Sequence, residues 1–318
     1  VAFSHFFFNL ITAIAAIALF YPLTQLIIYN YPTQQDPVIA LAIFHTAFNL
    51  LGVIVFTPFI GIFSRFIKKI YPEKKAVYTQ FIHSTLPNFP EASINAFKNE
   101  ANYLYQLVMH HNLKALYIDE TLVLNPLYNN DGNKINMPKE VSQTYLIIKE
   151  LQSELFDYAS QLQENELSPE DADFINRILH SVRYAVSSTK TMKDYQHEFE
   201  DLYNSDNASG VQYYQYFRQA LIAFYLKIKE LNEQTEAAQM IPILHQMAKN
   251  IRLENEDFSQ TIIKKLAKRE LPTTLVNNVL SAQRGFSQSE RQIVLCFKDF
   301  LLTNEEAKIF EGFENQEL

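Results

Sequence analysis

The stretch that decides the fold is PVIALAIFHTAFNLLGVIVFTPFIGIFS, residues 37–64, in which no side chain carries a charge. Residues 1–35 form a second charge-free run, so Asp36 is the single charged residue of the first 64. Each run is longer than the roughly 20 apolar residues that a helix needs to cross a hydrocarbon core about 30 Å thick. The two runs therefore predict a pair of transmembrane helices, near residues 3–28 and 38–63.

A short basic segment follows the second run. Residues 65–75 contain five cationic side chains against Glu73: Arg65, Lys68, Lys69, Lys74 and Lys75. Of the formal net charge of −8, residues 1–64 contribute −1 and residues 65–75 contribute +4, which leaves −11 for residues 76–318. Because Lys and Arg beside a membrane exit favour the cytoplasmic side, we expect a multi-pass protein of the cell (inner) membrane with residues 65–318 cytoplasmic. Two core helices of a soluble bundle are the alternative interpretation of the apolar runs, and the basic segment argues against it.

The two runs share a pattern of residues at an offset of 40. It consists of Ala2, His5, Phe8, Asn9 and Leu10 in the first run and of Ala42, His45, Phe48, Asn49 and Leu50 in the second. Because residues four apart share a face of a helix, we expect His5 beside Asn9 and His45 beside Asn49. Polar side chains inside a membrane face the helix bundle or a water-filled path. These four residues are therefore candidates for interhelical hydrogen bonds or for a place beside a transport path.

The acidic remainder of the chain has the periodicity of long amphipathic helices with short breaks. We predict helices at 90–115, 138–164, 168–203, 211–231, 237–266 and 275–302. The start at Ser168 is marked by a hydroxyl cap, a proline at the first helical position and two acids in the first turn. With 6 Gly and 12 Pro in 318 residues, an all-β fold is unfavourable. We expect an all-α protein, with two transmembrane helices followed by an antiparallel bundle.

Few residues of the acidic helical part of the chain, residues 76–318, suggest a catalytic or metal-binding role. Asp194, Glu198 and Asp201 form an acidic helix face, which we interpret as solvated surface, with a metal site as the alternative. The adjacent His110 and His111 point about 100 degrees apart on a helix, and we assign them to a helix end. Cys296 lies in an apolar stretch and is expected to be buried. Signatures of phosphate loops, dinucleotide sites, serine hydrolases and zinc proteases are missing from the sequence, so we predict no enzyme and no cofactor.

The repeated A-x-x-H-x-x-F-N-L pattern, followed by an acidic helical body, resembles the bacterial sodium/phosphate cotransporters of the PNaS type. The resemblance implies a transmembrane hairpin at residues 1–64, a basic juxtamembrane linker at 65–80 and a cytoplasmic PhoU-like helical domain at 81–318. It implies sodium and inorganic phosphate as transported solutes and membrane lipid as surroundings. A homodimer or a regulatory protein would be the macromolecular partner, and nucleic acid is not expected at a pI near 5.5.

The Gln-Ser-Ser repeat that forms the ion and phosphate sites of this family does not occur in the sequence. Since the chain also begins with Val1 instead of Met, we expect it to be the C-terminal portion of a symporter whose solute sites lie upstream. His5, Asn9, His45 and Asn49 then remain as candidates for helix packing or the transport path. The alternative is a membrane-anchored helical interaction or regulatory module without transport activity.

Overall fold

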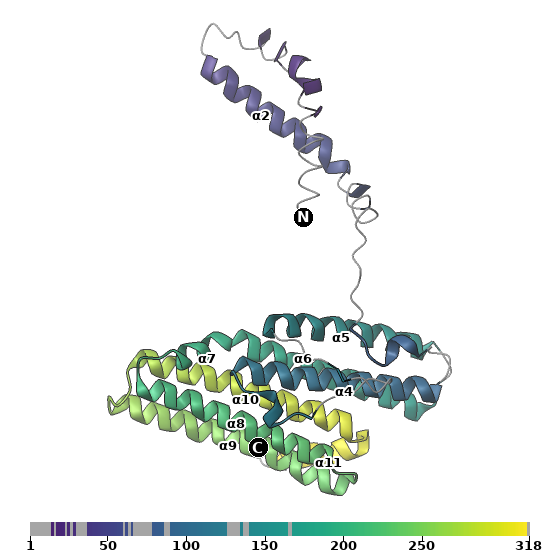
Figure 1. Cartoon of the computed structure of the whole chain (residues 1–318), viewed down its shortest axis with the longest axis vertical. Helices are drawn as coiled ribbons and strands as arrows, with labels where there is room; N and C mark the ends of the chain where they lie inside the picture. The colour runs from purple at the N-terminus through teal and green to yellow at the C-terminus, as the bar shows by residue number, and fades with distance from the viewer. Residues whose placement is uncertain are drawn as a thin grey trace. The chain divides into compact units, whose positions relative to one another are not determined.

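The structure is a computed structural model that describes residues 14–15, 17–22, 24–25, 28–29, 37–59, 61–62, 65, 78–85, 90–125, 134–135, 140–164 and 167–316. The chain divides into two compact units, Val1–Ala76 and Val77–Leu318, which we describe separately. Regular structure in the described residues consists of helices only, as Figure 1 shows. The predicted all-α class is confirmed for this part of the chain.

The first unit contains helix α2 (Pro37–Phe56), a 20-residue helix that continues into a short 3-10 turn, η1 (Thr57–Phe59). The described residues between 14 and 29 are also helical. The two segments meet through aromatic rings, since the ring centroids of Phe20 and Phe44 lie 5.6 Å apart, edge to face. Among the described residues, no helix combines the length and the hydropathy that a membrane crossing requires.

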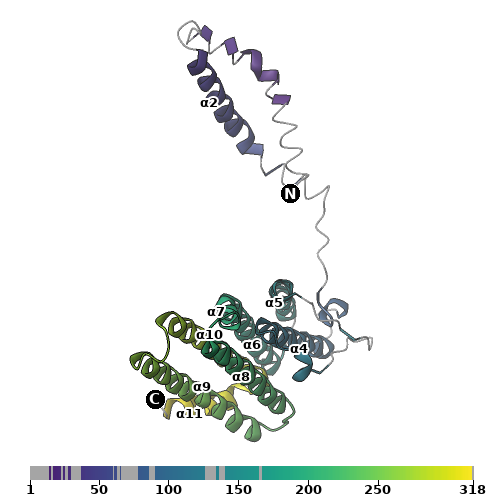
Figure 2. The ribbon, with the colours of Figure 1, turned by 60° about the vertical axis from the view of Figure 1, so that its left-hand side comes forward.

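The second unit is a bundle of long helices whose axes run side by side in both ribbon views (Figures 1 and 2). Its helices are α4 (Pro90–Ala115), α5 (Val141–Gln163), α6 (Pro169–Asp194), α7 (Gln196–Tyr203), α8 (Ala208–Asn232), α9 (Ala237–Ala267), α10 (Thr273–Leu301) and α11 (Asn304–Gln316). Two 3-10 turns, η2 (Ile82–Ser84) and η3 (Glu120–Leu122), flank α4. Helices α4, α5 and α6 pack together, and α10 packs along α6 and also contacts α7, α8 and α9.

Several helix boundaries follow from local chemistry that the sequence displays. Helix α4 has its predicted bounds, and α6 begins where the Ser168 hydroxyl accepts a hydrogen bond from the Asp171 backbone N–H at 3.1 Å. Pro169 occupies the first helical position, where its missing N–H costs nothing. The Asn207 side chain caps α8 in the same way, so this helix begins at Ala208, before the predicted start at residue 211, and includes Gly210.

The predicted helix at 168–203 is wrong in one respect, because the chain breaks at Tyr195 into α6 and α7. A Cβ atom at Gly285 of α10 would overlap the ring of Tyr195. Glycine at this position is therefore what allows the break between α6 and α7 to approach α10 closely. A further helix, α11, follows α10 and packs along α9.

An aromatic cluster joins α7, α8, α9 and α10. At its centre the fully buried Phe217 of α8 lies 5.5 Å from Phe199, 5.9 Å from Phe258 and 5.3 Å from Phe286, measured between ring centroids. Tyr216 adds a fourth ring at 5.5 Å. Aromatic side chains bury large apolar areas and gain further from such tilted arrangements. Phe217 is therefore the main apolar link between these four helices.

The segment that leads into the bundle is fastened to α4 by one carboxylate. The buried Glu100 accepts backbone hydrogen bonds from Phe81 at 2.7 Å, Gln80 at 3.0 Å and Ile82 at 3.1 Å. Burial raises the pKa of Glu100, while these three backbone donors act in the opposite direction. We call residues 78–85 the entry segment, since the chain passes through it on its way from the first unit to α4.

Candidate functional site

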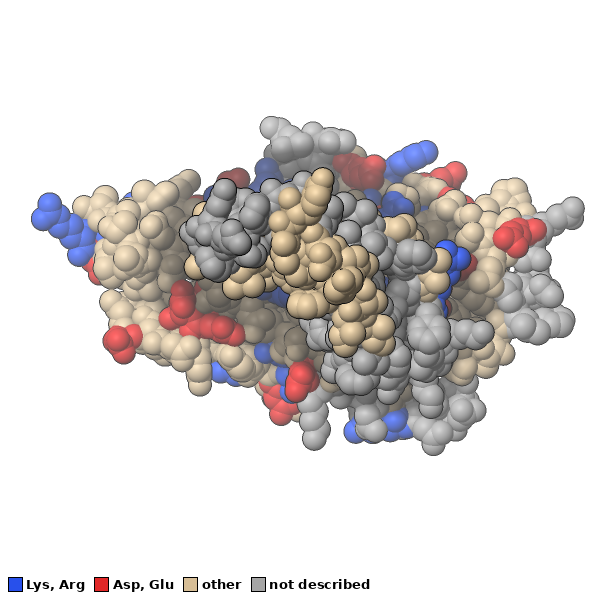
Figure 3. Space-filling model, turned by 90° about the horizontal axis from the view of Figure 1, so that it is seen from above, with Lys and Arg blue, Asp and Glu red and all other residues tan. Residues whose placement is uncertain are grey.

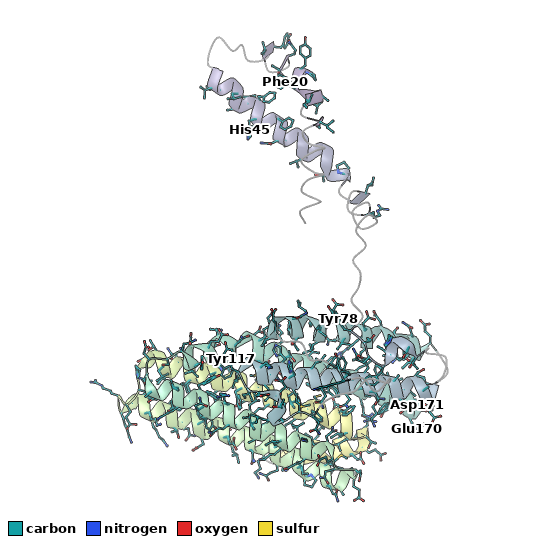
Figure 4. All side chains as sticks on the ribbon, in the orientation of Figure 1. Phe20, His45, Tyr78, Tyr117, Glu170 and Asp171 are labelled. Carbon is teal, nitrogen blue, oxygen red and sulfur yellow. The ribbon has the colours of Figure 1, made fainter. Side chains whose placement is uncertain are left out.

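Two of the four polar residues that the sequence singled out in the first unit, His45 and Asn49, lie in the described residues. On α2 the Asn49 amide nitrogen is 3.0 Å from His45 Nε2, which confirms that the two side chains share a face. Figure 4 shows His45 on α2 and Phe20 on the preceding segment. His5 and Asn9 lie outside the described residues, so the predicted second pair stays a prediction.

The bundle contains a polar centre that the sequence analysis missed. It consists of His111 and Asn112 of α4, Ser188 of α6, Tyr225 of α8 and Ser289 of α10, all buried. The Asn112 amide donates to Ser188 Oγ at 3.0 Å and to the Tyr225 hydroxyl at 2.8 Å. Ser188 and Ser289 share a hydrogen bond at 2.7 Å. Four helices are therefore held together by hydrogen bonds in an interior where an unpaired polar group would be costly.

His110 and His111 lie four to five residues before the last residue of α4, near the helix end as expected, and both are buried, which was not expected. The apolar stripe of α4 already indicated that His111 is buried. His111 follows Leu107 by four residues, so the two share the face that enters the core. His111 Nδ1 lies 3.2 Å from Asn112 Oδ1, which makes the histidine part of the polar centre.

The polar centre is uncharged at neutral pH. Burial lowers the pKa of His111 to about 4, and the nearby His110 and Lys193 act in the same direction against the hydrogen bond to Asn112. Burial also raises the pKa of the Tyr225 hydroxyl. The cluster can therefore donate and accept hydrogen bonds, but it holds no charge that would attract an ion.

His111 gives the bundle a stability that depends on pH. In the unfolded chain a histidine takes up a proton near pH 6.5, whereas folded His111 does so only near pH 4. Its contribution to the free energy of unfolding is therefore complete above pH 6.5. That contribution is lost as the pH falls towards 4, by about 3 kcal/mol.

Urea unfolding of the wild type and of His111→Gln at pH 4.5 and pH 7 measures this contribution. We expect the wild type to lose more stability than the variant between pH 7 and pH 4.5. Gln212→Ala on the exposed face of α8 removes no titratable group, and as the control it should keep the wild-type pH dependence. Equal pH dependence in the wild type and in His111→Gln would contradict the assignment.

The acidic residues that were predicted to form a solvated face divide between surface and core. Asp194 and Asp201 are exposed, as predicted, whereas Glu198 is buried and accepts a hydrogen bond from the Ser281 hydroxyl at 3.2 Å. Within the described parts of the chain, no group of three His, Cys, Asp or Glu side chains is arranged to hold a metal ion. Cys296 is buried as predicted, and burial raises the pKa of its thiol.

Comparison of the chain with protein families, with curated proteins and with solved structures finds no match. The functional assignment therefore rests on residue patterns and on the contacts described above.

Proposed function

We propose that this chain is the C-terminal part of a sodium-dependent inorganic phosphate symporter of the cell membrane. In this proposal residues 1–64 complete the membrane domain as a transmembrane hairpin, and the helical bundle is a cytoplasmic regulatory domain. The observation that carries the proposal is the pattern A-x-x-H-x-x-F-N-L, which stands once in each charge-free run at an offset of 40.

Repeated segments with polar side chains at matching positions are typical of transporters built from internal repeats. Within lipid, an imidazole and an amide need partners, and each partner restricts how neighbouring helices pack. On α2 the imidazole of His45 and the amide of Asn49 partner each other within the same helix. We propose that His5, Asn9, His45 and Asn49 brace a site for sodium and phosphate whose ligands belong to the upstream part of the symporter.

A regulatory role for the bundle is supported by how the chain enters it. The basic residues 65–75 stand between the apolar and the acidic parts of the sequence, where they can interact with anionic lipid. Beyond them, the entry segment is fixed to α4 through Glu100. The linker is therefore fixed to the bundle at the entry segment, so a movement of α4 would also move the end of the linker.

Uptake of labelled phosphate by the full-length protein in proteoliposomes tests the proposal. We expect uptake that requires an inward sodium gradient and is missing when potassium replaces sodium. His45→Leu removes the partner of the Asn49 amide within α2, so it should reduce uptake about severalfold. Val53→Leu, an apolar exchange at an exposed position of α2, should leave uptake unchanged.

Correctly inserted protein without sodium-dependent uptake would contradict the symporter. A membrane-anchored interaction module would then explain the same sequence, provided that the bundle retains a stoichiometric protein partner.

A further inference from the structure

A cleft with a volume of about 730 Å³ lies between α9 and α10 in the described part of the bundle. Five of the residues that line it are basic: His245, Lys249 and Arg252 on α9, and Arg284 and Arg291 on α10. No Asp or Glu belongs to the lining. A cleft with only basic charges is unusual in residues 76–318, whose formal net charge is −11.

The spacing of these residues shows why the charges face one space. On α9 the three basic residues stand at intervals of four and three, which places them on one face of the helix. On α10 the two arginines are seven residues apart, again on one face. Since α9 and α10 pack against each other, the two basic rows form the two sides of the same cleft.

Neighbouring acids do not neutralise the arginines of α10. Among the residues that the structure describes, neither Arg284 nor Arg291 forms an ion pair with a carboxylate. Glu290 is adjacent to Arg291 in sequence but is buried, and burial together with the nearby Glu254 raises its pKa well above the ordinary value. Burial thus favours the uncharged form of Glu290, so this carboxyl is a poor ion-pair partner for the neighbouring guanidinium group.

The lining of the cleft also contains neutral groups that form hydrogen bonds. The Ser287 hydroxyl donates to Asn255 Oδ1 at 3.3 Å and accepts from Gln283 Nε2 at 2.8 Å, so side chains of α9 and α10 are joined beneath the basic rows. Ser259 and Gln288 also line the cleft. Hydroxyl and amide donors beside planar guanidinium groups are a combination that binds phosphate oxygens well.

We propose that this cleft binds a small molecule that carries a chain of linked phosphates. The Cα atoms of Arg284 and Arg291 are about 10.5 Å apart along the helix axis, a spacing that a chain of linked phosphates matches better than a single phosphate group does. The volume falls within the range of about 300–1,000 Å³ that is typical of small-molecule sites. A nucleoside polyphosphate and a short inorganic polyphosphate share this chemistry.

A large, extended polyanion such as a nucleic acid or a membrane surface is less suited to the cleft than a small molecule. Such partners select broad single-sign patches, whereas the charges here are gathered in a hollow. On the face seen in Figure 3, Lys and Arg side chains are interspersed with Asp and Glu and form no continuous patch. The inference concerns α9 and α10 alone, so it does not depend on the transport proposal.

Isothermal titration of the complete chain in detergent micelles tests the site, with sodium tripolyphosphate as the first probe. We expect saturable binding to one site, and binding of orthophosphate weaker by about 100-fold because it offers fewer oxygens and less charge to the two arginines. ATP distinguishes the two sources of the phosphate chain. Tighter binding of ATP than of tripolyphosphate assigns the site to a nucleotide, and the reverse order assigns it to an inorganic chain.

The double variant Arg284→Gln with Arg291→Gln should weaken tripolyphosphate binding by about 100-fold. Both side chains are exposed, so the fold should be retained, and far-UV circular dichroism checks this. Lys190→Gln with Lys264→Gln removes the same charge from exposed positions outside the cleft and should change the affinity less than about twofold. The proposal is overturned if wild type shows no saturable binding of either probe, or if the two double variants bind equally well.

Discussion

Replacing Glu100 with alanine is expected to lower the free energy of unfolding of the bundle by about 4 kcal/mol. The variant leaves the backbone N–H groups of Gln80, Phe81 and Ile82 without their acceptor, in a segment where Ile82 is buried and the other two residues are half-buried. A buried donor without a partner costs about 1–3 kcal/mol, so three such donors produce a large loss. Glu100→Gln retains one carbonyl acceptor and should lose about half as much.

Urea unfolding and amide hydrogen exchange measure the effect of the Glu100 variants. Exchange should accelerate most strongly at Gln80, Phe81 and Ile82, since these amides lose their hydrogen bonds directly. Glu150→Ala, at an exposed position of α5, is the control and should change stability by less than about 0.5 kcal/mol. Unchanged exchange in the entry segment of Glu100→Ala would show that the carboxylate does not hold it.

The second large effect is expected for Phe217→Ala, which should destabilise the bundle by about 4 kcal/mol. The side chain is fully buried and its ring is in contact with rings from α7, α9 and α10. Truncation removes the transfer free energy of the ring and leaves a cavity that surrounding helices fill only in part. Because Phe258 belongs to α9 and Phe286 to α10, we also expect the variant to loosen the walls of the basic cleft.

Leu253→Ala provides the comparison for Phe217→Ala, because Leu253 is 47% exposed on α9 and its truncation should cost less than about 1 kcal/mol. Thermal or urea unfolding of both variants gives the two values. A loss in Phe217→Ala no larger than that of Leu253→Ala would mean that the aromatic cluster collapses around the missing ring. Tripolyphosphate affinity of Phe217→Ala reports separately on the cleft.

The parts of the fold that depend on nearby residues were predictable from the sequence. The bounds of α4 and the start of α6 were predicted correctly, because proline, a capping hydroxyl and acids in the first turn act over a single helical turn. The pairing of His45 with Asn49 was predictable for the same reason, since a spacing of four fixes a shared face.

Features that arise from packing between distant segments were not predictable in this way. The close approach of Tyr195 to α10 requires Gly285, ninety residues later in the chain, and the sequence pattern of 168–203 contains no sign of it. Glu198 was expected on the surface, yet it is buried beside Ser281 of α10. The basic cleft likewise requires α9 and α10 to be neighbours, which no periodicity within either helix reveals.

The polar centre restricts which motions the bundle can make. Sliding α6 past α10 by one helical turn, about 5.4 Å, would separate Ser188 from Ser289 and leave both hydroxyl groups facing hydrocarbon. Asn112 would lose Ser188 in the same movement. Ratchet-like displacement of these helices is therefore disfavoured, and the bundle can respond to an effector mainly by turning as one solid body or by adjusting its outer helices α9 and α11.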